Sequence, residues 1–340
     1  MKVTTVTLLA SLVIARHALA VDRLVPSQYA TIQAAIDAAN AGDVVQISPG
    51  SYSGPIDLKG KSIVVRGSAD ASAVTVSGGA PVVRCVSGEP TSTVIEGLTI
   101  TGGLNPQADG GGVRCIGASL TIRNCRIIGN SANRGGGLFC EGGSPVISQC
   151  LVAGNTGSIP NRFPAGAGIF ISNSSARISD CLVTGNQMNV PYDSSAGQAG
   201  TPGSTTGAGI HAEGSQSVTI ERTTVTSNQQ VISASNCTNA GAGIFINCPG
   251  QISDCAVREN IISGCGTNVG GIYFAANLVS MRTTRVCGNV GTQILGAYIN
   301  LGGNSVAATC PSCPGDLNGD NQINGADLGL LLSNWGPCPN

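Results

Sequence analysis

The sequence has few charged residues, few aromatic residues and almost no histidine. Charged residues make up 10% of its 340 residues and aromatic residues 3%, and there are only two histidines. Surface helices normally carry many charges on their exposed face, so this scarcity argues against a mainly helical protein. The chain also contains 49 glycines, and together these features favour many short strands joined by tight turns.

The first 20 residues have the pattern of a secretory signal peptide. Lys2 supplies a positive start, residues 3–15 form an apolar stretch, and residues 18–20 (Ala-Leu-Ala) form a small-residue cleavage site. The alternative, a membrane anchor, would need a longer apolar stretch to span a bilayer. We therefore expect cleavage before Val21, a secreted or cell-surface protein, and no membrane span in the mature chain.

An excess of basic residues is also lacking. Loss of residues 1–20 leaves 15 basic residues against 18 acidic ones, a net charge near −3. Nucleic-acid-binding proteins usually present a basic patch or stripe, and the mature sequence offers none. Nucleic acid is therefore not an expected partner.

What the sequence does contain is a repeat of two phrases in a fixed order. The first phrase is Gly-(Gly/Ala)-Gly followed by an apolar residue, ending at Val113, Leu138, Ile169, Ile210 and Ile244, with a shortened copy at Ile272. The second is a short apolar run that ends on asparagine, at Asn130, Asn155, Asn186, Asn228, Asn260 and Asn289. A pair of phrases repeated in this way along the chain is typical of a solenoid, in which each repeat buries its apolar face against its neighbours.

One repeat shows how each turn of the solenoid is built. By alternation, Leu138 and Cys140 point inward and Phe139 points outward. Further short strands begin at Val146 and near Leu151, so we expect three strands per turn, each parallel to its neighbours in the next turn. This predicts an all-β protein, a parallel β-helix. The asparagines should stack at an inner corner and hydrogen-bond along the helix axis.

Residues 27–40 form the one convincing helix in the first 310 residues. Ser27 is the expected N-cap, and the apolar face is made by Ile32, Ala35, Ile36 and Ala39. A helix in this position would cover the open sheet edge of the first turn.

The 14 cysteines have two interpretations. Many cysteines in a secreted chain indicate a disulfide scaffold. Within the repeats, however, they fall into two columns of small inward side chains, which are Cys125, Cys150, Cys181 and Cys255 in one and Cys85, Cys115 and Cys140 in the other. Cys310, Cys313 and Cys338 lie outside the repeats and suit local disulfides.

The repeats differ in length at one place, just before the glycine phrase. Residues 104–109, 156–164, 187–206 and 229–239 are of unequal length and rich in polar residues, proline and glycine, so we expect loops along one edge of the solenoid.

A candidate ligand-binding stripe follows from the outward position after each glycine phrase, which is occupied by Arg114, Phe139, Phe170, His211, Phe245 and Tyr273. Exposed flat rings can stack on sugar faces, and arginine can bind carboxylates. The alternative is that the long loops fold over the stripe and bury it.

Residues 25–67, together with the repeats, resemble the right-handed parallel β-helix proteins of the pectin-lyase-like superfamily. The resemblance covers roughly residues 25–305, and we assign residues 21–308 to this domain. It implies a right-handed solenoid. It does not fix an activity, because the superfamily includes pectate lyases, polygalacturonases, pectin methylesterases, alginate-processing enzymes and non-enzymatic adhesins.

Residues 309–340 form a separate segment with the ligand spacing of a twelve-residue calcium loop. Oxygen ligands stand at loop positions 1, 3, 5, 9 and 12, with a backbone carbonyl at position 7, and the set is Asp316, Asn318, Asp320, Asn324, Asp327 and Gln322. An apolar stretch from Leu328 to Trp335 should form a short helix. The segment resembles one dockerin loop, whereas a complete dockerin has two. The resemblance implies a bound Ca2+ and a cohesin-like or surface docking partner.

The sequence carries no clear catalytic set. The paired aspartates and Gly-His-Gly of polygalacturonases are replaced here, for example by Ala167-Gly168 and Ala242-Gly243, so that acid/base pair is missing. We expect a monomeric, secreted protein that binds a polysaccharide or cell-surface polymer. The alternatives are a polysaccharide lyase or glycoside hydrolase, with its site on the face holding Arg114 and His211, and a structural surface protein without a ligand.

Overall fold

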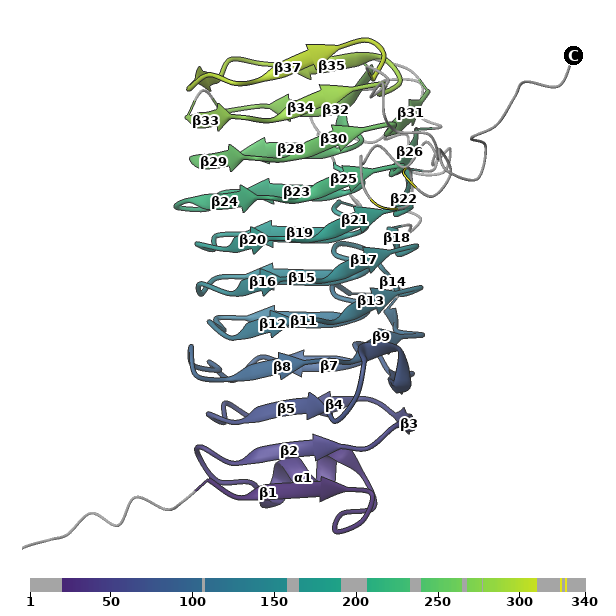
Figure 1. The fold of residues 1–340 in the computed structure, drawn as a ribbon, viewed down its shortest axis with the longest axis vertical. Coiled ribbons are helices and arrows are strands. Elements are labelled where there is room, and N and C mark those ends of the chain that lie inside the picture. The colour runs from purple at the N-terminus through teal and green to yellow at the C-terminus, as the bar shows by residue number, and fades with distance from the viewer. Residues whose placement is uncertain are drawn as a thin grey trace, which may run out of the picture.

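The computed structural model describes residues 20–105, 108–157, 165–190, 207–232, 240–264, 268–276 and 278–310, together with Gly325 and Leu328. The described chain winds as a tall parallel β-helix (Figure 1). Four parallel sheets run along its length, which we name A, B, C and D. Within one turn the chain passes from sheet A to B, then D, then C.

Sheet A runs the whole length of the solenoid and has 11 strands. In spatial order these are β1 (Asp22–Val25), β2 (Val44–Ile47), β5 (Val64–Gly67), β8 (Val94–Glu96), β12 (Thr121–Arg123), β16 (Val146–Ser148), β20 (Arg177–Ser179), β24 (Val218–Glu221), β29 (Gly250–Ser253), β33 (Val279–Arg282) and β36 (Ile299–Asn300).

Sheet B has ten strands and follows sheet A around a sharp corner. They are β3 (Gly50–Ser53), β6 (Val74–Ser77), β9 (Thr99–Thr101), β13 (Arg126–Ile128), β17 (Leu151–Ala153), β21 (Leu182–Thr184), β25 (Thr224–Thr226), β30 (Ala256–Arg258), β34 (Arg285–Cys287) and β37 (Ser305–Ala307). One 3-10 helix, η1 (Ala71–Ala73), widens the corner before β6.

Sheet C completes the turns, and sheet D adds a further strand only in the six turns from β10 to β31. Sheet C contains β4 (Ile56–Asp57), β7 (Val83–Cys85), β11 (Val113–Ile116), β15 (Leu138–Glu141), β19 (Ile169–Ser172), β23 (Ile210–Glu213), β28 (Ile244–Asn247) and β32 (Asn268–Phe274), with β27 (Ala240–Gly241) and β35 (Thr292–Leu295) also paired to β32. Sheet D contains β10 (Leu104–Asn105), β14 (Ser131–Ala132), β18 (Thr156–Gly157), β22 (Gln187–Val190), β26 (Gln229–Ile232) and β31 (Ile261–Ser263).

The prediction of three strands per turn was incomplete, because sheet D adds a fourth. Its strands occupy residues that we expected to begin the variable loops, such as residues 187–190 and 229–232. The backbone directly after each ladder asparagine is held in register with the turn below, so pairing continues for a few residues. Thr156 N–H, for example, donates to the carbonyl of Asn130, and Gln187 N–H donates to that of Asn155.

The six repeat asparagines form the predicted single file. The side-chain oxygen of each accepts from the backbone N–H and the side-chain amide of the one before, at 2.9–3.1 Å from Asn130 through Asn289. All six are buried. Gln293 accepts from Asn289 in the same way and ends the ladder. Every buried amide in the file therefore has partners.

The glycine phrase and the asparagine phrase recur together because the last glycine of the first packs directly against the asparagine of the second. A Cβ atom on Gly137 would lie 2.6 Å from the carbonyl oxygen of Gly168 and 2.8 Å from the side-chain nitrogen of Asn155. A Cβ on Gly168 would meet Asn186 in the same way. The last glycine of each phrase thus makes room for the asparagine that faces it across the core.

The core is a set of stacked inward columns, and the predicted cysteine columns are among them. Cys85, Cys115 and Cys140 are neighbours in register on β7, β11 and β15, and all three are buried free thiols. In the other column, each of the thiols of Cys125, Cys150, Cys181 and Cys255 donates to backbone carbonyls at the A–B corner. Threonine hydroxyls at positions 223 and 284 do the same, which explains why cysteine and threonine alternate there.

A helix closes the N-terminal end, as expected, but it is shorter than predicted. Helix α1 (Ile32–Ala38) packs on β1, β2 and β4 and buries Ile32, Ala35 and Ile36. Its N-cap is Thr31, whose hydroxyl accepts from Ala34 N–H, and not Ser27. The expected start was wrong because residues 26–31 first turn back over β1, where Tyr29 N–H donates to the carbonyl of Leu24.

At the other end of the solenoid, Cys310 is bonded to Cys287 on β34, as expected for a local disulfide. Residues 1–19, with most of the predicted signal peptide, and the six predicted calcium ligands, Asp316, Asn318, Asp320, Gln322, Asn324 and Asp327, lie outside the described residues. Within the described part of the chain, no helix is long and apolar enough to cross a membrane.

We predict that Asn186→Ala will lower stability strongly. Asn186 accepts two hydrogen bonds from Asn155 and donates to Asn228 and to the carbonyl of Val152. Each buried polar group left without a partner costs about 1–3 kcal/mol, so we expect a loss of roughly 2–4 kcal/mol. Urea unfolding measures it, with the exposed Asn247→Ala as the control. Equal midpoints for the two variants would show that the ladder contributes little.

Candidate functional site

The predicted stripe lies on the outer face of sheet C as one continuous file. Arg114, Phe139, Phe170, His211, Phe245 and Tyr273 are paired strand to strand in that order. Consecutive ring centroids from Phe139 to Tyr273 are 5.3, 5.0, 4.6 and 5.4 Å apart, and the first three contacts are stacked. The stacking follows directly from strand spacing and the predicted register.

The expected exposure is wrong for the middle of the stripe, from Phe139 to Phe245, whereas Arg114 and Tyr273 are half-buried. Phe139, Phe170, His211 and Phe245 are each at most 1% exposed. Part of the cover is Arg134, whose guanidinium carbon lies 5.3 Å and 4.9 Å from the ring centroids of Phe139 and Phe170. The alternative stated from the sequence, that the stripe is covered, therefore holds for these four side chains. Flat sugar rings cannot stack on these four side chains while this cover is in place.

Arg134 is held over the rings by a paired carboxylate. Its Nε and one terminal nitrogen donate to the two oxygens of Asp109 at 3.0 and 2.6 Å, a bidentate contact. This contact raises the pKa of Arg134. Asp109 lies before β11 and Arg134 before β15, so this contact joins two neighbouring turns.

His211 is the unusual member of the stripe, because it is polar and buried between two phenylalanines. Its Nε2 lies 3.1 Å from a carboxylate oxygen of Glu213, but without the alignment of a hydrogen bond, and Nδ1 has no partner among the described residues. Burial lowers the pKa of His211, and contact with the imidazole lowers the pKa of Glu213. The histidine is therefore neutral near pH 7. Its buried ring nitrogens without hydrogen-bond partners lower the stability of the folded state.

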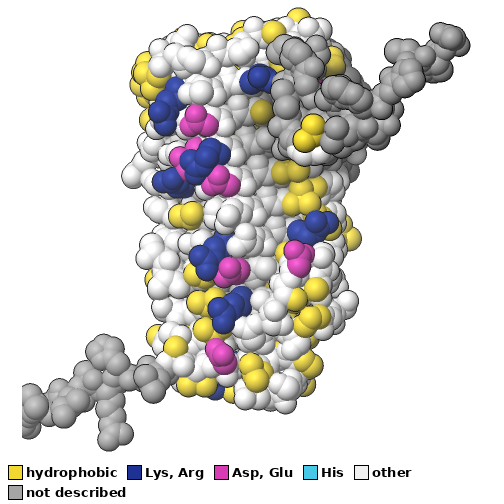
Figure 2. All heavy atoms as spheres, viewed as in Figure 1, with side chains coloured by type: hydrophobic (Ala, Val, Ile, Leu, Met, Phe, Trp, Pro, Cys, Tyr) yellow, Lys and Arg dark blue, Asp and Glu magenta, His cyan; other side chains and the backbone are white. Residues whose placement is uncertain are grey.

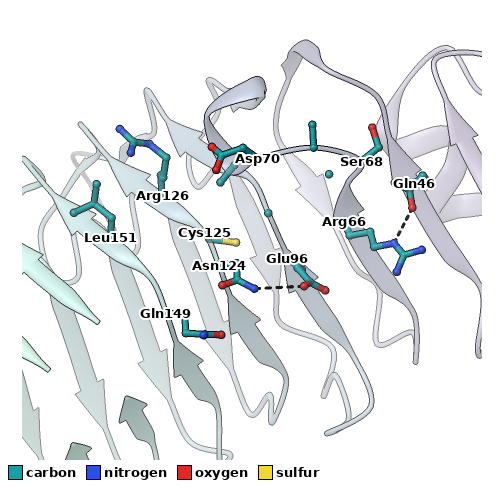
Figure 3. Close-up of a pocket in the computed structure, with 14 residues that line it drawn as sticks. Gln46, Arg66, Ser68, Asp70, Glu96, Asn124, Cys125, Arg126, Gln149 and Leu151 are labelled. Atoms are coloured by element: carbon teal, nitrogen blue, oxygen red, sulfur yellow. Dashed lines mark hydrogen bonds between the residues drawn. The ribbon is translucent and has the colours of Figure 1, made fainter. Parts of the chain in front are cut away.

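A second candidate site, which the sequence did not indicate, is a groove at the corner between sheets A and B (Figure 3). It encloses a volume of about 620 Å³. The outward side chains that line it are Gln46, Arg66, Ser68, Asp70, Glu96, Asn124, Arg126, Gln149 and Leu151. They come from five neighbouring turns, marked by β2, β5, β8, β12 and β16 in sheet A.

The groove exists because the corner changes shape along the solenoid. In the upper turns one residue in the left-handed conformation makes the corner, and Asn124 and Gln149 hold this position with φ of 51° and 54°. In the turn of β5 the corner is longer, and residues 67–73 swing outward through η1. Figure 3 shows Ser68 and Asp70 on this projecting segment, with Asn124 and Gln149 beside it. The segment forms one wall, and the tight corners form the floor.

The acidic side chains in the groove have hydrogen-bonding or ionic partners, whereas its two arginines form no ion pair with the described part of the chain. Glu96 is paired with Arg123 at 2.8 Å, and Asp70 accepts from the backbone and hydroxyl of Ser72. In contrast, Arg66 donates only to the amide oxygen of Gln46, and Arg126 makes no ion pair with any residue that the structure describes. Two guanidinium groups therefore face the groove with donors to spare. Figure 2 shows that basic and acidic side chains mostly lie side by side on the face in view. Arg222, for example, contacts both Asp180 and Glu221.

A metal centre was predicted only in the C-terminal segment. Within the described ranges, no three histidine, cysteine or acidic side chains are grouped so that they could hold a metal ion. The structure therefore adds no second metal site to the prediction, and the calcium loop itself remains a prediction.

We predict that His211→Phe will stabilise the protein, most strongly in acid. The folded pKa of His211 is below the ordinary value of 6.5, so below about pH 6.5 the unfolded state binds a proton that the folded state refuses. Wild-type stability should therefore fall as the pH drops through this range. The variant should gain about 1 kcal/mol at pH 8, from removal of unsatisfied nitrogens, and more at pH 5. Urea midpoints at both pH values measure the gain, and a gain that does not grow in acid would contradict this account of His211.

Known proteins are similar to this chain mainly in fold. Solved structures with a similar fold include an alginate lyase from Paenibacillus sp. str. FPU-7, at 15% identity and a TM-score of 0.42, over 85% of this chain and 99% of the lyase. A pectin methylesterase from Aspergillus niger is 14% identical, with a TM-score of 0.41, over 89% and 93%. The A-module of the mannuronan C-5 epimerase AlgE4 from Azotobacter vinelandii is 13% identical, with a TM-score of 0.41, over 83% and 93%. Nothing about activity follows from likenesses this distant.

No curated protein matches the sequence. The family model of the right-handed β-helix region matches residues 57–230, slightly more than half of the chain, in agreement with the stacked parallel sheets. The right-handed fold implied by the sequence resemblance is thereby confirmed. The chain belongs to the right-handed β-helix family.

Proposed function

We propose that this protein is a secreted β-helix protein that binds a polysaccharide or another cell-surface polymer, and that its C-terminal segment binds calcium and serves for docking. The observation that supports polymer binding best is the groove at the A–B corner. It crosses five neighbouring turns and presents amide and guanidinium groups on most of them. The buried stripe on sheet C has no part in this proposal.

A polymer suits the groove because both have a repeat along one axis. Strands of neighbouring turns lie about 4.8 Å apart, so five turns extend over roughly 19 Å. Gln46, Arg66, Asn124 and Gln149 follow one another along this axis, each on a different turn. Side-chain amides can both donate to and accept from sugar hydroxyls, and guanidinium groups bind carboxylates in a bidentate way.

The test is retention of the purified protein in gels that contain acidic or neutral polysaccharides. We expect Arg66→Gln combined with Arg126→Gln to weaken retention by at least about tenfold, because each hydrogen bond to a charged group contributes about 1.5–3 kcal/mol. Arg285→Gln is a matched control, since Arg285 lies on the outer face of sheet B far from the groove. Failure of the wild type to bind any polymer would refute the proposed function.

Calcium binding by residues 316–327 rests on ligand spacing and donor chemistry. Four carboxylate or amide side chains at positions 1, 3, 5 and 9, an aspartate at position 12 and one carbonyl supply the oxygens that Ca2+ prefers. Such a segment would join the protein to a cohesin-like or other surface partner.

We predict that the full-length protein binds calcium and that Asp316→Ala with Asp320→Ala abolishes binding, because the variant removes two of the anionic ligands. Isothermal titration with CaCl2 measures it. Asp254→Ala, which removes one exposed carboxylate on the solenoid, should leave binding unchanged. Equal calcium affinity in the double variant and the wild type would refute the loop assignment.

The enzymatic alternative, a polysaccharide lyase or glycoside hydrolase, would use the face of sheet C that holds Arg114, His211 and Glu213. The burial of His211 disfavours it, because a substrate must reach the reacting groups. The polysaccharide screen also follows unsaturated products and reducing ends, so it separates catalysis from binding.

A further inference from the structure

Two arginines lie side by side on the outer face of sheet C, in the turns that precede the aromatic part of the stripe. β4, β7, β11 and β15 are neighbours in this sheet (Figure 1), and their register places Asp57, Arg84, Arg114 and Phe139 in one outward column. Arg84 and Arg114 are therefore direct neighbours on strands about 4.8 Å apart. Like charges opposite each other in a sheet repel and lower its stability, unless an anion compensates for them.

The carboxylates beside this column do not neutralise both arginines. An oxygen of Asp57 lies 3.8 Å from Nε of Arg84, a long ion pair between two partly exposed side chains. Asp109 is engaged with Arg134 through both of its oxygens. Arg114 stands between these two pairs. Its Nε is shielded from solvent and has no hydrogen-bond partner, and no ion pair joins Arg114 to any side chain that the structure describes.

The arginine pair lies where the cover over this column ends. At β11 the preceding segment folds back on its own strand, so that a Cβ atom on Gly110 would lie only 2.8 Å from Cβ of Arg114. The segment before β7, residues 78–82, gives no such cover, and the side chain of Arg84 is 46% exposed. A ligand can therefore reach Arg84 from solvent and meet the half-buried Arg114 behind it.

We propose that Arg84 and Arg114 bind an oxoanion group, a carboxylate or a sulfate ester, on the outer face of sheet C. A guanidinium group presents N–H donors in a planar fork that matches two oxygens of such a group. An oxoanion between the two arginines offsets their repulsion and accepts hydrogen bonds that no described protein group accepts. The column has two guanidinium groups and one carboxylate, Asp57, so its net charge of +1 suits a single anionic group.

The oxoanion has two possible sources, an acid group on a polymer chain and a free anion such as sulfate. This inference goes beyond the proposed function, because it adds a site on sheet C that the corner groove does not include. Sheet C and the A–B corner lie on different sides of each turn. Loss of binding in the groove therefore leaves the arginine pair testable by itself.

The test is isothermal titration of the full-length protein at low ionic strength with sodium sulfate, dextran sulfate and uncharged dextran. The parent protein carries Arg66→Gln and Arg126→Gln, so that the groove does not contribute. We expect it to bind both sulfate probes but not dextran. Adding Arg84→Gln and Arg114→Gln should weaken sulfate binding by at least about tenfold, since charge-assisted hydrogen bonds are lost.

Arg285→Gln is the matched control, because it removes one guanidinium group from the outer face of sheet B and should leave sulfate binding unchanged. Stronger binding of dextran sulfate than of sodium sulfate would assign the site to the acid groups of a polymer, and equal binding per sulfate group to a free anion. Either result supports an oxoanion site. Equal sulfate affinity with and without the two sheet C substitutions would overturn it, as would a parent protein that binds neither sulfate probe.

A stability measurement tests the same pair without relying on affinity. In the absence of sulfate, Arg84→Gln should raise the urea midpoint, because it removes the repulsion between the arginines. A few millimolar sulfate should then raise the midpoint of the wild type more than that of the variant. NaCl at equal ionic strength separates binding from screening. The same response to sulfate and to NaCl in the wild type would contradict the proposed site.

Discussion

The asparagine ladder is the interaction on which the rest of the structure depends. Because each side-chain oxygen accepts from the backbone and the side chain of the previous asparagine, consecutive turns are fixed in one register. That register stacks the inward columns, the thiol columns and the outer file on sheet C. Sheet D is a direct result, since its strands begin where the ladder has just aligned the backbone. The corner groove lies mainly on turns that precede Asn130, and there parallel strand pairing such as β2 with β5 and β5 with β8 keeps the turns in line.

Much of the fold was predictable from the sequence because each turn of the solenoid corresponds to one copy of a sequence repeat. Aligned asparagines, cysteines and glycines gave the columns, and the parallel register placed Phe139, Phe170 and His211 in one file. Two features escaped. The fourth strand, found in the turns from β10 to β31, has no apolar alternation of its own. The start of α1 is set by a tertiary turn over β1 that local capping rules do not contain.

The candidate sites were harder to foresee. Alternation tells which way a side chain points relative to the core, but not whether another segment covers it, and Arg134 with Asp109 provides cover that no local pattern reveals. The groove arises from a difference between turns, namely the long corner at residues 67–73 against the one-residue corners at Asn124 and Gln149. Arg66 and Arg126, which form no ion pair with the residues that the structure describes, line it from two different turns. A repeat describes what turns share, whereas the proposed ligand site comes from where they differ.

The spacing of the ladder has an evolutionary consequence. Between Asn130 and Asn155 lies a complete turn of 25 residues, which touches only the turn on either side and carries no long loop. Duplication or loss of such a unit would lengthen or shorten the molecule without disturbing either terminus. The protein can thus change its length in steps of one layer, and the extent of the proposed polymer-binding surface could be adjusted by copying a gene segment rather than by altering individual contacts.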